Sequence, residues 1–370
     1  MLPDKIENIL ADLSTVFTPN EILIASPDFD PQQRRTDLPM IAYRAVPDQR
    51  DWFLTAGDYF AAASQAEEHD IANVLLLGPD ASSLPLSAIR QMAEVLWAGA
   101  DLTVPSYSLG PHEGLVNSGL LYPITRALFA NVRFPLVADA GMSKRMALRM
   151  KTIAQRHATL SQPDTVVWPV AEAAVAALAV RQIDAGSRFL RAPDVADFNA
   201  LFIEVAGALF LDIEAKASFW QRTRARVMAT GMQSSPVDYN DDDGELSSMV
   251  EAFRLAYNNL QEIWSLVLPP QSLLALKKLS ISEPSVFSMP RELWARIVYD
   301  FALAFHLRTL NRGHLLGALT PLYLAWAASM LRSTHDQATS AAHHEETAIA
   351  FEREKPYLVS RWRWPDRFNP

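Results

Sequence analysis

The sequence predicts an α/β domain followed by an all-helical domain, with the boundary at residue 195. Three observations support this prediction. The first half alternates helical spacing with short apolar runs, as β-α-β units do. After Phe198 the strand-like runs fade and helical periodicity takes over. The chain also has 370 residues, which is long for one ordinary core and suits two domains, 1–195 and 196–370.

The first half shows a regular succession of elements. Expected helices lie at residues 6–13, 52–68 and 89–96, and expected strands at 22–25, 40–45, 73–77 and 102–104. The clearest strand, residues 73–77, is stopped by Gly78 and Pro79. This order predicts a mostly parallel sheet with helices on both faces.

Helical patterns cover most of the second half, at residues 198–232, 246–268, 290–310 and 317–331. Ser288 is expected to cap the third of these helices, with Pro290 in its first turn. The apolar run at 315–330 is shorter than the roughly 20 residues that a membrane span needs, so a buried helix pair is expected there. Residues 234–245 are expected to form an exposed loop.

Composition excludes several function classes. A net charge of −9 argues against a general nucleic-acid binder, which needs clustered Lys and Arg. The sequence has no cysteine, which excludes disulfides, thiolate zinc sites and cysteine nucleophiles. Its acidic, amphipathic start is not typical of a signal peptide, and a cytoplasmic protein is expected.

Several ordered motifs resemble one enzyme family. They are VPSYSLGPHEGLVN at 104–117, YPITRALF at 122–129, RFPLVADAGMS at 133–143, ELWARIVYD at 292–300, LTPLY at 319–323 and KPYLVSRW at 355–362. Their order is similar to that in the GT-A glycosyltransferases that make glucosyl-3-phosphoglycerate and mannosylglycerate, in the long form with a C-terminal helical domain. The family's opening strand, with its Pro-x-x-Asn-Glu signature, is not found, so an incomplete GT-A domain is expected at 1–195.

The resemblance implies a reaction and its partners. It implies transfer of a hexose, with retention, from a nucleotide sugar to a small acidic acceptor such as glycerate or phosphoglycerate. Members are typically dimers, so a homodimer or pairing with a homologue is expected through the helical half, where Trp294, Trp326, Trp362 and Trp364 lie. A second hypothesis keeps the scaffold but not the activity: a non-catalytic paralogue that serves as a partner or regulatory subunit.

On the donor side, the resemblance points to Asp80, Arg191 and Asp139. The family binds Mg²⁺ or Mn²⁺ with an Asp-x-Asp pair and a histidine, whereas this chain keeps one carboxylate, Asp80, and has Arg191 near the histidine position. A lone carboxylate is a poor magnesium site, so dependence on a divalent metal is doubtful. Two alternatives stay open: Asp80 as a turn residue, and Asp139 as the cap of a helix at 143–150.

On the acceptor side, the resemblance points to five residues: Tyr107, His112, Glu113, Arg126 and Glu172. An arginine fork suits a carboxylate or phosphate, but Arg126 could equally pair with an aspartate at the surface. Glu172 could be a surface residue of a buried helix within AEAAVAALAV. No catalytic base is assigned, because the departing diphosphate can take the acceptor proton in a retaining reaction.

Two further acidic or histidine-rich segments are set aside. Residues 241–245 are similar to a calcium loop, but aligning Gly244 with its sixth position puts Tyr239 first and Val250 twelfth, where Asp and Glu are needed. The second set, which is expected to lie in a solvated linker, is His335, His343, His344 and Glu345.

Overall fold

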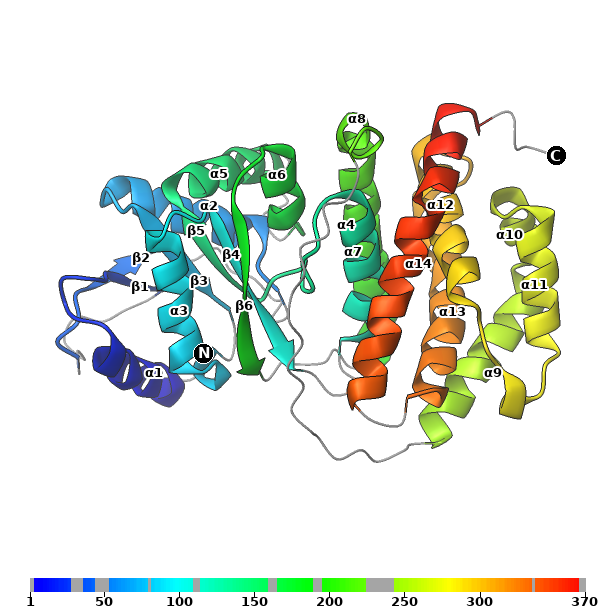
Figure 1. Cartoon of the computed structure of the whole chain (residues 1–370), viewed down its shortest axis with the longest axis horizontal. Helices are drawn as coiled ribbons and strands as arrows, with labels where there is room; N and C mark the ends of the chain where they lie inside the picture. Colours follow the sequence, from blue (N-terminus) through cyan, green and yellow to red (C-terminus); the bar gives the residue numbers. More distant parts are fainter. Residues whose placement is uncertain are drawn as a thin grey trace. The chain divides into compact units, whose positions relative to one another are not determined.

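The computed structural model describes residues 3–27, 36–43, 53–78, 81–108, 114–158, 165–188, 195–223, 243–334 and 337–365. The chain divides into two compact units. Unit 1 comprises Met1–Leu109 and Phe134–Ala192, and unit 2 comprises Gly110–Arg133 and Pro193–Pro370. Unit 1 is α/β and unit 2 is helical in the described residues (Figure 1). No single cut at residue 195 yields this division, because Gly110–Arg133 groups with unit 2.

Unit 1 contains every strand of the described chain. Its elements are α1 (Pro3–Val16), β1 (Ile24–Pro27), β2 (Met40–Tyr43), α2 (Ala56–Glu68), β3 (Asn73–Leu77), η2 (Ala81–Ser83), α3 (Leu86–Trp97), β4 (Leu102–Ser108), β5 (Asp139–Ser143), α5 (Lys144–Ala158), α6 (Pro169–Val175) and β6 (Val180–Ser187). The predicted helices and strands of residues 6–104 are confirmed, with shifted ends. Strands β5 and β6 were not predicted.

Four strands form the main sheet in the order β3-β5-β4-β6. Strands β4 and β6 are parallel, whereas β5 runs antiparallel to both β3 and β4. The prediction of a mostly parallel sheet is therefore wrong where β5 inserts. Gly141 of β5 is closely packed there, since a Cβ at this position would overlap the side chains of Thr103 and Leu75 on the two neighbouring strands. Strands β1 and β2 form a separate, parallel pair.

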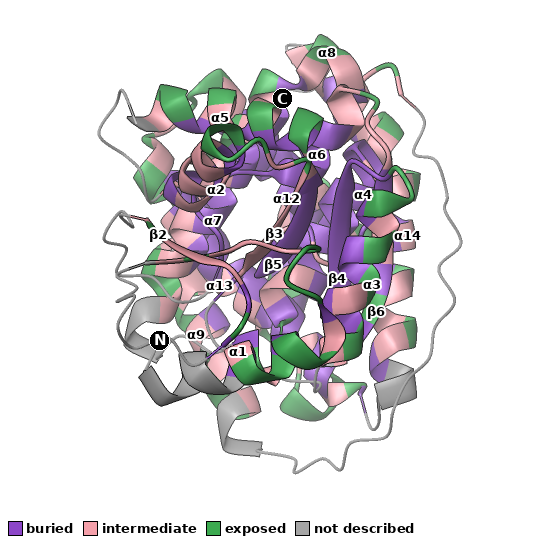
Figure 2. Ribbon diagram, turned by 90° about the vertical axis from the view of Figure 1, so that its left-hand side faces the viewer, coloured by how far each residue is buried: buried purple, intermediate pink, exposed green. Residues whose placement is uncertain are grey.

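The directions of the strands bring the ends of three strands and the start of a fourth to one edge of the sheet. Strands β3, β4 and β6 point the same way, so they end at the same edge, and the reversed strand β5 begins there with Asp139. Helix α3, backed by α1, covers one face, and α2, α5 and α6 cover the other (Figure 1). Strands β4 and β5 are almost wholly buried between these layers (Figure 2).

The described elements of unit 2 are all helical. They are η3 (Asn117–Leu121), α4 (Tyr122–Leu128), α7 (Val195–Ala215), α8 (Ala217–Trp220), α9 (Asp243–Asn259), α10 (Gln261–Val267), α11 (Pro270–Ser280), η4 (Pro284–Val286), α12 (Arg291–Leu307), α13 (Arg312–Arg332) and α14 (Gln337–Arg363). Element η3 is one turn of π-helix. The four predicted helical stretches correspond to α7 to α10, α12 and α13, whereas α11 and α14 were not predicted.

Three local predictions in unit 2 are wrong. Pro290, with an extended backbone, precedes the first residue of α12, so Ser288 is not the N-cap. The apolar run at 315–330 lies in the single helix α13, which contains Pro321, and not in a helix pair. The expected linker around His343 belongs to α14, because this helix buries an apolar stripe that includes Ala348 and Phe351. Residues 234–242 of the expected loop lie outside the described residues.

Helix α13 forms the centre of unit 2. By length and composition alone it is the one described helix that could cross a membrane, and 78% of its most apolar window is buried inside the protein. The Trp326 ring of α13 stacks on Trp294 of α12, with ring centroids 6.0 Å apart. The Trp294 indole N–H donates to the carbonyl of Gly119 at 2.6 Å, and the Trp264 indole donates to that of Ala318 at 2.9 Å. Buried indoles need such partners.

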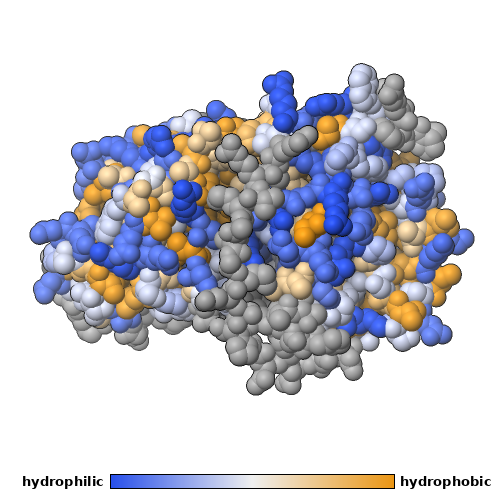
Figure 3. Space-filling view, viewed as in Figure 1, coloured by the Kyte–Doolittle hydropathy of each residue, from blue (hydrophilic) through white to orange (hydrophobic). Residues whose placement is uncertain are grey.

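The tryptophans expected at an interface divide between core and surface. Trp294 and Trp326 are buried in the core, Trp362 stacks on His306, and Trp364 is 59% exposed. Large apolar side chains are also exposed on α9, α10, α11 and η4 and directly after α11, namely Leu255, Leu266, Leu274, Val286 and Ile281. Figure 3 shows apolar patches among polar ones where Figure 1 places α9 to α11. Association through the helical half stays a prediction.

Gly119 and Gly317 provide a matched test of the core of unit 2. Gly119→Ala should lower the free energy of unfolding by about 2 kcal/mol or more, because its Cβ would overlap the Trp326 ring in a close-packed core. Gly317→Ala should raise it by about 0.5–1 kcal/mol, because its Cβ meets nothing within 4 Å and alanine favours the helix. Urea unfolding followed by circular dichroism measures both, and equal effects would contradict this packing.

Candidate functional site

The structure describes four of the eight residues predicted to form a site. Asp80, Arg191, His112 and Glu113 lie outside the described residues. Asp139, Tyr107 and Glu172 lie in unit 1, and Arg126 lies in unit 2. Of the three in unit 1, Asp139 and Tyr107 are in direct contact, and Glu172 pairs elsewhere.

Asp139 lies at the start of β5, opposite Leu77 of β3, and is fully buried. Its Oδ1 accepts the backbone N–H of Gly78 at 3.0 Å and Arg188 Nη2 at 3.2 Å. Its Oδ2 accepts the Tyr107 hydroxyl at 2.7 Å and Arg188 Nε at 3.0 Å. Four donors thus fill the lone-pair directions of the carboxylate. Asp139 is not a helix cap, so that sequence alternative is wrong.

Arg188 is the main residue that sequence reasoning missed. It follows β6 directly, and its side chain is fully buried against Asp139 in a bidentate ion pair. Its Nη1 also donates to Ser83 Oγ, in η2, at 2.8 Å. The local sequence gives little signal for it, because β6 has the mixed sequence VRQIDAGS and the apolar residues 171–180 before it were interpreted as one helix. In the structure α6 ends at Val175 and Ala177 has a positive φ of 54°, which separates helix from strand.

Tyr107 completes the cluster from β4. Burial raises the pKa of its hydroxyl well above the usual range, and the charge of Asp139 acts in the same direction. The Phe134 ring meets the Tyr107 ring edge to face at 5.1 Å. The hydroxyl therefore stays protonated as a donor to Asp139. It positions the carboxylate and is not available as a base.

The close approach of backbone around Asp139 requires glycine at position 78. A Cβ at Gly78 would overlap the carbonyl oxygen of Ala138, which precedes β5. The end of β3 and the start of β5 therefore lie in tight contact, and the Gly78 N–H points directly at Asp139. This close backbone contact excludes any side chain at position 78.

Glu172 lies in the first turn of α6 and pairs with Arg149 of α5. Arg149 Nη2 lies 2.7 Å from Glu172 Oε2, and the glutamate side chain is only 12% exposed. The alternative of a surface glutamate is wrong because the side chain is largely buried, whereas the acceptor-side role stays a prediction. Its described role is to join α5 to α6.

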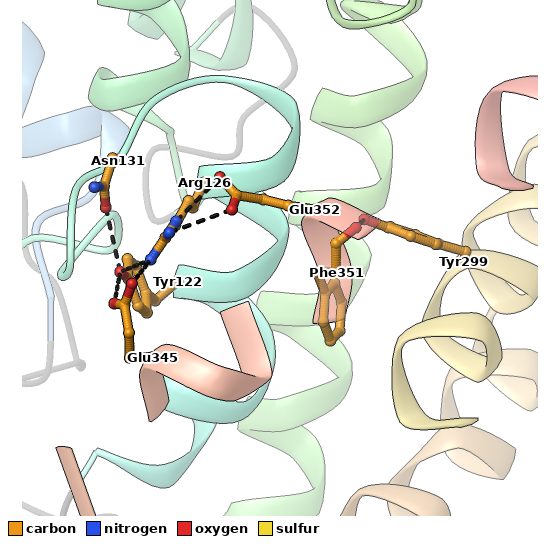
Figure 4. Close-up of polar contacts among 7 residues, drawn as sticks. All are labelled: Tyr122, Arg126, Asn131, Tyr299, Glu345, Phe351 and Glu352. Carbon is orange, nitrogen blue, oxygen red and sulfur yellow. Dashed lines mark hydrogen bonds and ion pairs between the residues drawn. The ribbon is translucent and has the colours of Figure 1, made fainter. Parts of the chain in front are cut away.

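Arg126 lies on α4 in unit 2, where two glutamates of α14 hold it (Figure 4). Its Nε and Nη2 donate to the two oxygens of Glu352 at 3.1 and 3.2 Å, and its Nη1 donates to Glu345 at 2.5 Å. The same Nη1 lies 2.9 Å from the Tyr122 hydroxyl. The side chain is 5% exposed. The alternative of a surface pair with an aspartate is wrong, and the guanidinium is already neutralised within unit 2.

A second buried charge joins α12 to α14. Asp300 Oδ1 accepts the Tyr357 hydroxyl and Arg361 Nη1, both at 2.7 Å. Its Oδ2 has no hydrogen-bond partner among the described residues. Burial raises the pKa of Asp300 to about 7, against the opposing effects of Arg361 and Tyr357. This carboxyl group thus titrates near neutral pH.

The residues that the structure describes do not fit a divalent metal. No group of three His, Asp or Glu side chains among them could hold one. Asp139, the described donor-side carboxylate, already accepts four N–H or O–H donors. The guanidinium of Arg188, which lies against it, would repel a cation. Asp80 stays the one predicted ligand and lies outside the described residues.

No family model matches this chain, and no curated protein does so. The glycosyltransferase hypothesis therefore depends on the ordered motifs of the sequence. The structure contributes the α/β architecture of unit 1 and the helical architecture of unit 2.

Two buried tyrosines of unit 1 test the Asp139 cluster. Tyr107→Phe should lower the free energy of unfolding by about 1–3 kcal/mol, because it removes one donor from a buried carboxylate. Tyr59→Phe should be neutral or slightly stabilising, because the Tyr59 hydroxyl is buried and has no hydrogen-bond partner among the described residues. Thermal and urea unfolding give both values. A larger loss in Tyr59→Phe would contradict the network.

Asp300 predicts a pH dependence of stability. Its pKa is about 7 in the folded chain against an ordinary 3.8, so between these values the folded state binds more protons than the unfolded state. Stability from this group is therefore present at low pH and is lost as pH rises through 7.

Urea unfolding at pH 5 and pH 8 of the wild type and of Asp300→Asn isolates this titration. From pH 5 to pH 8, the free energy of unfolding of the wild type should fall by more than about 1 kcal/mol relative to that of the variant. One pKa unit corresponds to about 1.4 kcal/mol. A wild type that loses no stability relative to the variant between pH 5 and pH 8 would mean that Arg361 keeps Asp300 ionised throughout.

Proposed function

We propose that the chain is a retaining glycosyltransferase that transfers a hexose from a nucleotide sugar to a small acidic acceptor of the glycerate or phosphoglycerate type. The ordered motifs of both halves support this proposal. The α/β architecture of unit 1, followed by helices, is compatible with an incomplete GT-A domain and a C-terminal helical domain.

One observation supports the proposal most directly: three strands end at one edge of the sheet of unit 1, with polar groups gathered there. Ligands of open α/β sheets bind outside the carboxyl ends of the strands. At this edge lie Tyr107 near the end of β4, Arg188 after β6, and Asp139 and Ser83 beside them. Asp80, the predicted donor-side carboxylate, belongs in sequence to the connection that follows β3.

The reaction needs little proton transfer by the protein. The bond between the sugar anomeric carbon and the donor phosphate oxygen breaks, and a bond from that carbon to an acceptor hydroxyl forms on the same face. The departing diphosphate takes the acceptor proton. The protein then has to position both substrates and stabilise the negative charge of the diphosphate.

A specific observation favours the alternative of a non-catalytic paralogue. Each described candidate is engaged inside its own unit: Asp139 and Tyr107 with each other and Arg188, Glu172 with Arg149, and Arg126 with two glutamates. These side chains support the scaffold. In this alternative the units keep the family's architecture and act as a partner or regulatory subunit.

Binding of nucleotide sugars should be weak and nearly independent of divalent metal, because the sequence keeps one of three metal ligands and offers Arg191 as a fixed cation. Thermal unfolding with UDP-, GDP- and ADP-sugars, with and without Mn²⁺, measures this. We expect a shift of a few degrees for one sugar nucleotide, unchanged by EDTA and lost in Arg191→Ala.

Two other outcomes would contradict weak, metal-independent binding of a nucleotide sugar. If no nucleotide sugar stabilises the chain, the non-catalytic alternative holds. If tight, Mn²⁺-dependent turnover survives in Asp80→Ala but stops on chelation, the assignment of Asp80 to the metal is wrong. Arg181→Ala is the matched control for Arg191→Ala, because Arg181 is an exposed arginine of the neighbouring strand β6.

A further inference from the structure

Helix α14 contains a proline close to its C-terminal end. Pro356 lies inside the helix, which continues to Arg363. Proline has no N–H, so it cannot donate to the carbonyl of Glu352, and its ring crowds the same carbonyl. Sharp bends of helices are found at such positions. Pro356 therefore divides α14, and residues 357–363 can open as a unit while the rest of the helix stays in place.

One buried carboxyl group of α12 binds this last segment of α14. Asp300 Oδ1 accepts the Tyr357 hydroxyl and Arg361 Nη1, both at 2.7 Å, and the Asp300 side chain is fully buried. Its Oδ2 has no hydrogen-bond partner among the described residues. An ionised carboxylate with a buried, unpaired oxygen is costly. Opening of the segment would let water reach that oxygen and remove this cost.

Apolar and aromatic contacts hold the same segment independently of Asp300. Leu358 is only 1% exposed. The Trp362 ring stacks on His306 of α12, with ring centroids 4.3 Å apart, and meets the buried Trp220 of α8 edge to face at 5.1 Å. These contacts keep the segment closed in most molecules. The charge of Asp300 then changes the small fraction in which it is open.

The charged and titratable groups that act on Asp300 come from α12 and α14. They are Arg361 and Tyr357 of α14 and Arg296 of α12, which is itself paired with Glu354 of α14. Among the described residues, none comes from α7, α10, α11 or α13, which also pack on α12. All three favour the ionised carboxylate, but burial outweighs them and raises the pKa of Asp300 to about 7.

Two further titratable groups lie beside the segment. His306, which stacks on Trp362, lies 3.3 Å from Glu214 of α7. Lys355, directly before Pro356 in the chain, donates to the carbonyl of Thr223 at 2.7 Å, and burial lowers its pKa to about 8. A variant at Asp300 is therefore needed to separate its titration from theirs.

We propose that residues 357–363 form a pH-sensitive latch on unit 2, which pivots at Pro356, is held closed by protonated Asp300 and is favoured to open when Asp300 is ionised. The direction follows from linkage. The pKa of Asp300 is about 7 in the closed state and returns to its ordinary 3.8 once the group is hydrated, so the closed state binds more protons. Stability of the closed latch is present at low pH and is lost as pH rises through 7. The inference does not depend on the proposed glycosyltransferase activity.

Hydrogen exchange of residues 357–363 at pH 6 and pH 8 tests the latch, with each rate corrected for intrinsic exchange at that pH. The opening constant of the wild type should rise about tenfold between these values, because they bracket the pKa of the closed state. In Asp300→Asn it should change by less than about twofold. Glu346→Gln is the matched control, since it removes an exposed ion pair between α14 and Arg291 of α12 on the other side of Pro356. It should keep the tenfold rise.

Pro356→Ala tests the hinge. Alanine restores the N–H that the carbonyl of Glu352 lacks and joins the two parts of α14. Residues 357–363 should then open at least about fivefold less at both pH values, with the tenfold ratio between pH 8 and pH 6 retained. Residues 341–352, in the part of α14 before the hinge, serve as the internal reference. Their opening should not change between pH 6 and pH 8 in any of these proteins.

Four results would overturn the latch. They are a wild-type segment whose opening does not rise with pH, an equal rise in Asp300→Asn, an equal rise in residues 341–352, and unchanged opening in Pro356→Ala. The third would show that unit 2 opens as a whole, and the fourth that the segment does not pivot at Pro356. If Asp300→Asn does not fold, the wild-type rise, the internal reference and Pro356→Ala still decide between a latch and none.

Discussion

The buried ion pair between Asp139 and Arg188 is the constraint on which the sheet of unit 1 depends. Asp139 begins the one reversed strand, and Arg188 follows the last strand of the sheet, so a single contact connects segments 49 residues apart. Removing one partner of such a pair costs about 3–5 kcal/mol, because the other charge stays buried and unpaired. Tyr107 and the Gly78 N–H share the same carboxylate. The ends of β3, β4 and β6 are therefore fixed by one side chain at the start of β5.

Unit 2 uses the same principle with helix α14 as the common partner. Helix α14 supplies Glu345 and Glu352 to Arg126 on α4, and it supplies Tyr357 and Arg361 to Asp300 on α12. Apolar burial supplies most of the stability of such a helical core but has little directionality. Charged bonds to two neighbouring helices set the rotation and register of α14. They also explain why Gly110–Arg133, inserted between two strands of unit 1 in sequence, belongs to unit 2.

The sequence predicted the helices and strands that have a clear periodicity of their own. It did not predict those that form through pairing or packing with distant segments. Strand β3 and helices α3 and α12 have clear periodicity, and they were predicted. Strand β5 has the sequence DAGMS, which is typical of a turn, and it becomes a strand by pairing with β3 and β4, which lie far from it in the sequence. Helix α14 begins with polar residues and looked like a linker. For the site, the motif resemblance pointed to Asp139 and Tyr107. Arg188 could be found only from the tertiary structure, because no local pattern shows that β6 ends near the start of β5.

Charge balance limits how a diphosphate could be bound by the described residues. Arg188 is neutralised by Asp139, Arg149 by Glu172, Arg145 by Asp101, and Arg126 by two glutamates. A phosphate group that approached any of them would have to displace a carboxylate that is already well placed. The positive charge that a nucleotide sugar needs must therefore come from elsewhere in the chain or from a bound cation. Under the proposed function this charge is expected from Arg191, three residues beyond Arg188 in the sequence. Under the proposed function, the motifs that resemble those of the glycosyltransferases therefore account for a scaffold, and the charge that would bind the donor has to be supplied separately.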